Sequence, residues 1–262
     1  MNPIETLFVG VLPVILEVLI KNIKTVHHKA IKLFRNGDSS MLIAGIIGSE
    51  GKLQTAGLIN SILTSKGKRL SVVDSKNLLE LDLKRIRAYI GELEKNNTDI
   101  LLLKINITDI DSFLMHDLHF DILIYTGRAE KPLELDHTRY SDNMGRFFTL
   151  MADKGVVIVN ADDSGLLSLL QGLKQHVVTY GFNTKASITT SSVGDPMLEN
   201  SFICCLQRTI SARNGDIIEP QEYKLELEAS GFDTHSVLAA ASFAIVNGID
   251  LNRSGEIQPF NM

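Results

Sequence analysis

The chain has 262 residues, of which 44% are hydrophobic and 22% are charged, so it can bury the core of one large domain or two modest ones. Its net charge of −5 and its pI near 5.8 argue against a general nucleic-acid-binding protein, which usually carries a basic surplus. The two cysteines, Cys204 and Cys205, are adjacent and lack metal-ligand spacing, which favours a reduced, cytoplasmic protein.

An uncharged run, LFVGVLPVIL, occupies residues 7–16 near the start of the chain. It is too short to cross a bilayer, which needs about 20 residues. No basic stretch precedes it and no small-residue cleavage site follows it, so a secretory signal is not indicated. We therefore expect a cytoplasmic protein.

Residues 14–34 have apolar side chains at three- and four-residue spacing, which predicts an amphipathic helix within an N-terminal segment, 1–37. Its other face is basic. The commoner arrangement for such a helix is packing on its own domain with the charged face in water. The alternative is docking on a partner protein or on an anionic membrane surface, at the inner face of the membrane. The candidate docking residues are Lys21, Lys24, Lys29, Lys32 and Arg35.

From residue 38 onward strands and helices alternate, which indicates one doubly wound α/β domain, 38–262, with a mostly parallel sheet. The predicted strands are 41–47, 69–73, 100–105, 122–126, 156–160 and 176–180. The predicted helices are 55–66, 78–95, 109–117, 141–151, 164–173 and 236–247. Shorter alternating stretches at 187–192, 201–207 and 223–227 predict a small antiparallel appendage.

The segment GSEGK at 48–52, between the first strand and the first helix of this domain, is typical of a P-loop-like turn. In such a turn, backbone N–H groups face an anion, glycines allow its close approach, and the lysine reaches the outer phosphates. The following Ser or Thr normally binds magnesium, but here this residue is Leu53. The candidate nucleotide- or phosphate-binding residues are Gly48, Ser49, Gly51 and Lys52.

These residues also have structural interpretations. The glycines can be required by the backbone angles of the turn alone, and Lys52 can lie in solvent near Glu50 as a weak surface pair. In the NADD turn at 160–163, Asp162 and Asp163 are expected to cap the next helix. The histidines near the predicted helices lack a metal-binding pattern, so no metal site is predicted.

Three further features follow the turn at 48–52 in order: Asn160-Ala-Asp-Asp163, Tyr180-Gly181 and the segment GFDTHSVLAAASFAIVNGI at 231–249. With them, the chain resembles the central domain of the Mur ligases, nearest to the UDP-N-acetylmuramyl-tripeptide synthetase type. The resemblance implies an ATP-dependent ligase that forms an acyl phosphate on a peptidoglycan precursor, with magnesium. Residues 1–37 do not resemble the family's N-terminal domain, and we expect nothing after residue 250 to supply its C-terminal domain.

The residues that the resemblance assigns to phosphate and magnesium are only partly present. Gly48, Gly51 and Lys52 match the family's phosphate loop. Leu53 replaces its magnesium-binding threonine, and Glu50 adds a carboxylate to a loop that would hold an anion. Like charges about 4 Å apart repel by about 1 kcal/mol even in water. The loop is therefore expected to disfavour a triphosphate.

Other family positions also differ. Lys104 and Thr108 stand where the resemblance places a magnesium-binding glutamate and a histidine, and Asp233 and Ser236 stand where it places two adenine-contacting asparagines. The segment 141–151 lacks the lysine that the family carbamylates. We therefore predict a pseudoenzyme without catalytic residues, ATP or magnesium, which binds a partner protein of the cell wall or of division. The alternative is an ATP- and magnesium-dependent amide ligase, or a nucleotide-binding subunit completed by another chain.

Overall fold

The computed structural model describes residues 41–48, 51–116, 118–127, 137–163, 165, 170–191, 201–227 and 232–252. Its strands are β1 (Leu42–Ile47), β2 (Leu70–Asp74), β3 (Ile100–Ile105), β4 (Phe120–Tyr125), β5 (Met151–Asn160), β6 (His176–Tyr180), β7 (Ile188–Thr190), β8 (Ser201–Leu206), β9 (Ile210–Ser211), β10 (Ile217–Ile218) and β11 (Gln221–Glu226). Its helices are α2 (Lys52–Ser65), α3 (Ser75–Leu79), α4 (Leu83–Lys95), η1 (Ile107–Asp109), α5 (Ile110–His116), α6 (His137–Phe148) and α8 (Thr234–Val246).

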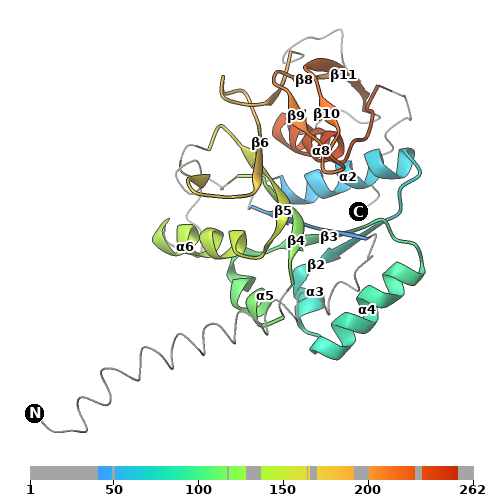
Figure 1. The fold of residues 1–262 in the computed structure, drawn as a ribbon, viewed down its shortest axis with the longest axis vertical. Helices are drawn as coiled ribbons and strands as arrows, with labels where there is room; N and C mark the ends of the chain where they lie inside the picture. Colours follow the sequence, from blue (N-terminus) through green and yellow to red (C-terminus); the bar gives the residue numbers. More distant parts are fainter. Residues whose placement is uncertain are drawn as a thin grey trace, which may run out of the picture. The chain divides into compact units, whose positions relative to one another are not determined.

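Nine strands form one sheet in the order β11-β8-β7-β6-β5-β4-β1-β3-β2 (Figure 1). The strands from β2 to β7 run parallel, which confirms the predicted doubly wound fold. The predicted antiparallel part is divided between two places. β8 and β11 continue the main sheet in antiparallel pairing, and β9 and β10 form a separate two-stranded sheet.

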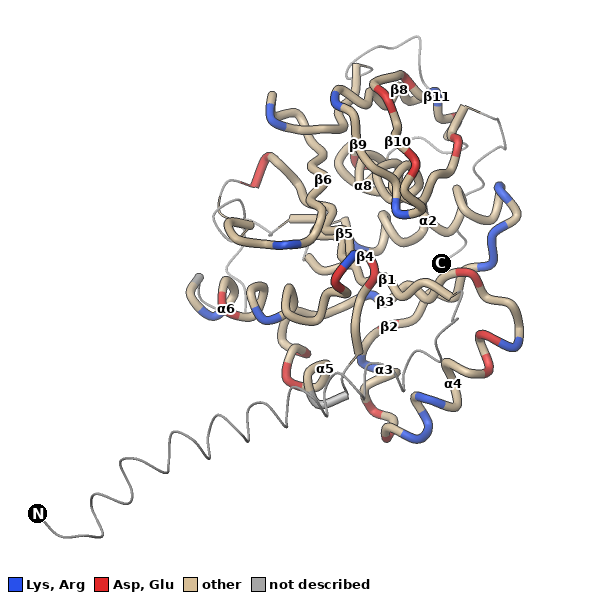
Figure 2. The backbone as a smooth tube through the Cα atoms, in the orientation of Figure 1, with Lys and Arg blue, Asp and Glu red and all other residues tan. Residues whose placement is uncertain are grey.

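Helices cover both faces of the sheet and enclose two hydrophobic cores (Figure 1). α2 and α8 pack on one face, and α3, α4, α5 and α6 pack on the other. α8 contains no Asp, Glu, Lys or Arg and is buried from Ser236 to Val246, as expected of a helix that is apolar around most of its circumference. The helices on the two faces differ in charge. Figure 2 shows that charged residues occur along α4 but are nearly absent from α2 and α8.

The helix predicted at 78–95 is instead two helices, α3 and α4. The Asp74 side chain accepts the Lys76 N–H at 3.1 Å and caps α3. The Asp82 side chain accepts the Arg85 N–H at 2.9 Å and caps α4. Each cap starts a new helix, because an aspartate at this position satisfies an N–H group that has no partner within the helix.

The helix predicted at 141–151 begins earlier, at His137, and ends at Phe148. Met151 belongs to β5, where it pairs with Phe120 of β4. Half of the helix predicted at 164–173, namely residues 164 and 166–169, lies outside the described residues, as does the whole segment 1–37. The carboxyl ends of β1, β3, β4, β5 and β6 lie at one edge of the sheet, where parallel folds of this type place their sites.

Candidate functional site

The turn after β1 is the first part of the site. Gly48 and Gly51 in this turn are both packed so closely against neighbouring side chains that a Cβ would clash. Gly48 has a φ of 147°, and a Cβ there would lie 2.2 Å from Thr126 Oγ1. Gly51 precedes α2 with a φ of 66°, and a Cβ there would lie 2.6 Å from Ser236 Oγ. Packing within the fold therefore accounts for both glycines.

Lys52 extends to the end of β3. Its Nζ donates to Ile105 O and to Asn106 Oδ1, both at 2.9 Å. Burial lowers the pKa of Lys52, and the nearby carboxylates of Asp74 and Asp109 partly offset this effect. The half-buried side chain is thus not the solvated lysine of the structural interpretation. Its ammonium group bonds to atoms of the protein itself.

A second ammonium group lies at the same edge of the sheet. Lys104 Nζ is 3.9 Å from Asp74 Oδ2, and its charge adds to the lowering of the Lys52 pKa. Asp109 accepts a hydrogen bond from Ser75 Oγ at 2.8 Å. We call Lys52, Asp74, Lys104 and Asp109 the β3-end cluster. Its two ammonium groups and two carboxylates balance one another in charge.

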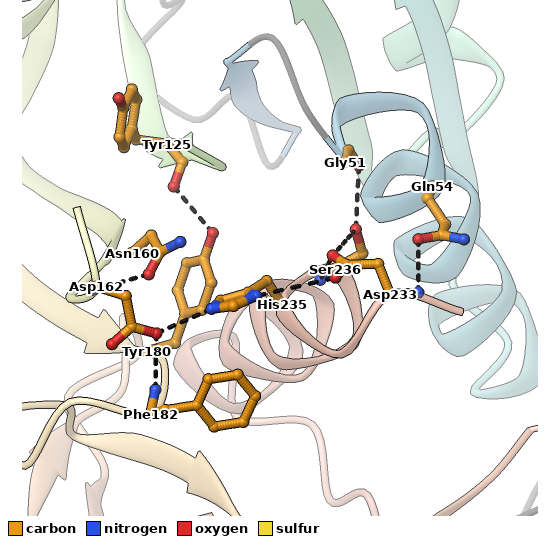
Figure 3. Close-up of polar contacts among 10 residues, drawn as sticks. All are labelled: Gly51, Gln54, Tyr125, Asn160, Asp162, Tyr180, Phe182, Asp233, His235 and Ser236. Carbon is orange, nitrogen blue, oxygen red and sulfur yellow. Dashed lines mark hydrogen bonds and ion pairs between the residues drawn. The ribbon is translucent and has the colours of Figure 1, made fainter. Parts of the chain in front are cut away.

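Asp162, in the turn after β5, connects three segments of the chain. Its Oδ2 accepts the Phe182 N–H at 2.8 Å, and its Oδ1 accepts the Asn183 N–H at 2.7 Å. His235 Nε2 lies 2.9 Å from Oδ2 (Figure 3). Gly181 must be a glycine, because a Cβ there would lie 2.5 Å from Asp162 Oδ2. The prediction that Asp162 caps the next helix is therefore wrong, since its carboxylate faces the β6–β7 turn and α8.

The Asp162 carboxylate is stabilised by these contacts. Burial acts to raise its pKa, but the hydrogen bonds from the Phe182 N–H, from His235 and from the Asn183 N–H outweigh burial and hold the pKa below its ordinary value. Hydrogen bonds to the charged form have this effect in general. The turn thus holds an ionised carboxylate whose hydrogen bonds are made to other groups of the protein.

Asp163 agrees with its predicted role, because its Oδ1 accepts the Gly165 N–H at 3.1 Å. Its Oδ2 also accepts the Tyr125 hydroxyl at 2.6 Å, and the Tyr180 hydroxyl donates to Tyr125 O at 3.0 Å. Burial raises the pKa of both tyrosines, so both hydroxyls remain protonated donors. These bonds fix the turn after β5 to the ends of β4 and β6.

The start of α8 is fastened to the start of α2. Asp233 caps α8 by accepting the Ser236 N–H at 2.8 Å and the Ser236 hydroxyl at 3.0 Å. The Asp233 N–H donates to Gln54 Oε1 at 2.9 Å, and Ser236 Oγ lies 3.4 Å from Gly51 O (Figure 3). The two residues at the implied adenine-contacting positions thus use their polar atoms within the protein.

Sequence reasoning missed His235 and Phe182. The two rings pack edge to face with centroids 4.9 Å apart, and His235 Nδ1 lies 3.8 Å from Asp233 Oδ1. His235 could have been noticed in the string DTHS at 233–236, where a histidine follows a helix-capping aspartate by two residues. The contact with Asp162 had no signal, because 73 residues separate it from His235.

Several predicted residues lie outside the described ranges, so their roles stay predictions: Ser49, Glu50, Lys21, Lys24, Lys29, Lys32 and Arg35. Among the residues that the structure describes, no three His, Cys, Asp or Glu side chains are grouped to hold a metal ion. Within the same residues, every helix is too short or too polar to cross a membrane.

Comparison with known proteins identifies related sequences. Residues 46–204 match the family model of the Mur ligase middle domain. The chain is 22% identical over 242 residues to the UDP-N-acetylmuramoyl-L-alanyl-D-glutamate--2,6-diaminopimelate ligase of Halalkalibacterium halodurans, covering 85% of this chain and 47% of that protein. It is 23% identical over 180 residues to the chloroplastic MurE homolog of Arabidopsis thaliana, covering 61% of this chain and 23% of that protein. The chain thus spans less than half the length of these relatives.

Solved structures share the fold. A UDP-N-acetylmuramoyl-L-alanyl-D-glutamate--2,6-diaminopimelate ligase superimposes with a TM-score of 0.62 at 15% identity, over 81% of this chain and 44% of that one. The MurF ligase from Thermotoga maritima in complex with ADP gives a TM-score of 0.53 at 15% identity, over 88% of this chain and 53% of that one. Because the family model matches more than half of its 262 residues, the chain belongs to the Mur ligase family, through the middle domain.

Proposed function

We propose that this protein is a non-catalytic member of the family, which acts by binding a partner protein rather than by ligating peptidoglycan precursors. One observation carries the proposal: the polar groups at the family's ligand positions are bonded within the fold. Lys52 donates to the end of β3, while Asp233 and Ser236 fasten α8 to α2. A ligand at these positions would have to replace hydrogen bonds that are already made.

The residues present do not fit magnesium ATP. Magnesium takes oxygen ligands in an octahedral arrangement. In the positions that the resemblance assigns to metal ligands, this chain has the hydrocarbon side chain of Leu53, which is 61% exposed, and the ammonium group of Lys104. An ammonium group repels a divalent cation, and Glu50 adds repulsion toward phosphate.

The rim of the site carries apolar side chains that suit a protein partner. Leu53, in the first turn of α2, is 61% exposed, and Phe182, in the β6–β7 turn, is 47% exposed. Aromatic side chains such as that of Phe182 are enriched in protein interfaces. The family relationship favours a partner from cell-wall synthesis or division.

A nucleotide-binding subunit completed by another chain is the second candidate, in which case ATP and magnesium would be its cofactors. One observation favours it, since the chain retains Gly48, Gly51 and Lys52 of the phosphate loop.

Nucleotide titration distinguishes the two candidates. We expect isothermal titration with millimolar MgATP to show weak binding or none. A dissociation constant below about 100 μM, near −5.5 kcal/mol, would contradict the non-catalytic proposal. The double variant Glu50→Asn, Leu53→Thr is the positive control. It should bind phosphate more tightly than the parent, because it removes a carboxylate and restores a hydroxyl ligand for magnesium.

A further inference from the structure

The main sheet ends at β11, which is an edge strand (Figure 1). One side of β11 pairs antiparallel with β8, and no strand of the described residues pairs with the other side. The free side of an edge strand presents N–H and C=O groups to which a strand of another chain can bind. Proteins commonly close such an edge, because this pairing leads to aggregation.

The side chain of Asn252 bonds to the backbone of β11. Its Oδ1 accepts the Lys224 N–H at 3.2 Å, and its Nδ2 donates to Glu222 O, also at 3.2 Å. Backbone groups two residues apart in a strand point to the same side, so both bonds lie on the side of β11 that faces away from β8. One residue of a parallel strand would make the same two bonds, one as donor and one as acceptor. The amide of Asn252 thus takes the place of one residue of a further strand.

The residues between α8 and Asn252 hold the amide in this place. Gly248, with a φ of 70°, turns the chain after the end of α8. Leu251 is 4% exposed and packs in the core between the sheet and α8. The Asp250 carboxylate accepts the Asn252 N–H at 3.0 Å. The position of the amide therefore depends on packing within the domain as well as on its two bonds to β11.

The charges of β11 favour a second copy of this chain as the competing strand. Two β11 strands that pair antiparallel about a twofold axis at Tyr223 place Glu222 of each copy opposite Lys224 of the other. Opposite charges directly across an antiparallel pair attract each other. This pairing uses the Glu222 C=O and the Lys224 N–H, which are the two groups that bond to Asn252. Asn252 and a second copy would therefore compete for the same atoms.

We propose that the side chain of Asn252 closes the β11 edge against pairing with a second copy of the chain. The closure consists of two hydrogen bonds, so removal of the amide frees the Glu222 C=O and the Lys224 N–H together. The freed edge then pairs with the same edge of another copy, in the register that places Glu222 opposite Lys224. The inference concerns self-association, so it does not depend on the ligand or partner protein proposed above.

Hydrogen exchange at the Lys224 amide tests whether Asn252 closes the edge. In dilute Asn252→Ala, the protection of this amide should fall about fivefold relative to the parent, the factor that corresponds to one hydrogen bond of ordinary net strength. The matched control is Asn96→Ala, at an exposed asparagine that follows α4. It should leave the exchange of the Lys224 amide as in the parent. Unchanged exchange in Asn252→Ala would overturn the proposal.

Sedimentation velocity over a concentration series tests the pairing with a second copy. Asn252→Ala should associate more strongly than the parent and Asn96→Ala, and its Lys224 amide should regain protection as the concentration rises. Adding Lys224→Glu to Asn252→Ala should abolish the added association, because Glu222 would then face a like charge. Adding Glu222→Lys as well exchanges the two charges and should restore it. Parent-like association of Asn252→Ala, or association that these charge changes leave unaltered, would overturn the proposal.

Discussion

Asp121 is a buried aspartate whose side chain forms a hydrogen bond to the backbone of a neighbouring strand. It is 3% exposed and lies in β4, where the register with β5 shifts between Phe120 and Ile122. Its Oδ2 accepts the N–H of Ile43 in β1 at 2.9 Å, and its Oδ1 lies 3.5 Å from Arg213 NH1. The carboxylate thus supplies an acceptor to a strand N–H group and neutralises a guanidinium from the β9–β10 hairpin.

Replacing Asp121 should destabilise the fold. We expect Asp121→Ala to lower the free energy of unfolding by about 3 kcal/mol, because it leaves the Ile43 N–H without an acceptor and Arg213 without its counter-charge. Asp121→Asn should cost less, because its amide oxygen can still accept a hydrogen bond. Urea denaturation measures both. The control Asp153→Ala, at an exposed position of β5, should stay within about 0.5 kcal/mol of the parent, and an equally small effect of Asp121→Ala would contradict this interpretation.

At the scale of residues, the role of a side chain could be predicted when its hydrogen-bond partner is close to it in the sequence. Asp163 was predicted as a cap and bonds to Gly165, two residues on. Asp162 was misassigned, because its partners Phe182 and His235 are 20 and 73 residues away. A cap depends on local geometry, whereas the partners of Asp162 depend on which strands the sheet brings together. The phosphate-binding role of the glycines and Lys52 stays a prediction, and the contacts of Asp162 could not be predicted from the sequence.

At the scale of elements, continuous apolar runs were predictable. The strands predicted at 100–105 and 176–180 have the bounds of β3 and β6. The first is a mostly apolar run, the second is rich in β-branched and aromatic residues, and both are bounded by turn or polar residues. The division between α3 and α4 was missed, although Asp74 and Asp82 are ordinary helix-start signals. The joining of β8 and β11 to the main sheet depends on long-range pairing, which hydrophobic periodicity does not encode.

The packing of α2 against α8 gives a prediction with a matched control. Gly51 and Gly67 flank α2 with φ values of 66° and 72°, but a Cβ would clash with Ser236 Oγ only at Gly51 and meets nothing within 4 Å at Gly67. Gly67→Ala should therefore cost about 1 kcal/mol of stability through backbone strain alone. Gly51→Ala should cost about 1 to 2 kcal/mol more, because Ser236 must move. Urea denaturation compares them, and equal losses would show that the contact with α8 does not depend on Gly51.

At the scale of the whole molecule, charge is unevenly distributed along the chain. The net charge is −5, yet the predicted helix at 14–34 and the residue after it carry four lysines and one arginine, with no acidic residue after Glu17. A basic segment attached to an acidic protein should favour anionic partners locally while the remainder repels them. Any attachment to an anionic surface should therefore depend on these basic residues rather than on total charge.

The last prediction tests this dependence with two variants of equal charge. We expect the parent chain to co-sediment with anionic vesicles at moderate salt. Changing Lys21, Lys24, Lys29 and Lys32 to glutamine should abolish this binding, because each basic residue near an anionic surface contributes about 1 kcal/mol. The stability of the folded domain should hardly change, since exposed charges contribute little to folding. The control variant makes the same substitution at four exposed lysines of the α/β domain, Lys76, Lys84, Lys95 and Lys154. Its binding should equal that of the parent, because it removes the same charge from a different part of the chain. If both variants lose binding equally, total charge rather than the basic helix controls attachment, and if the parent does not bind, the docking role is wrong.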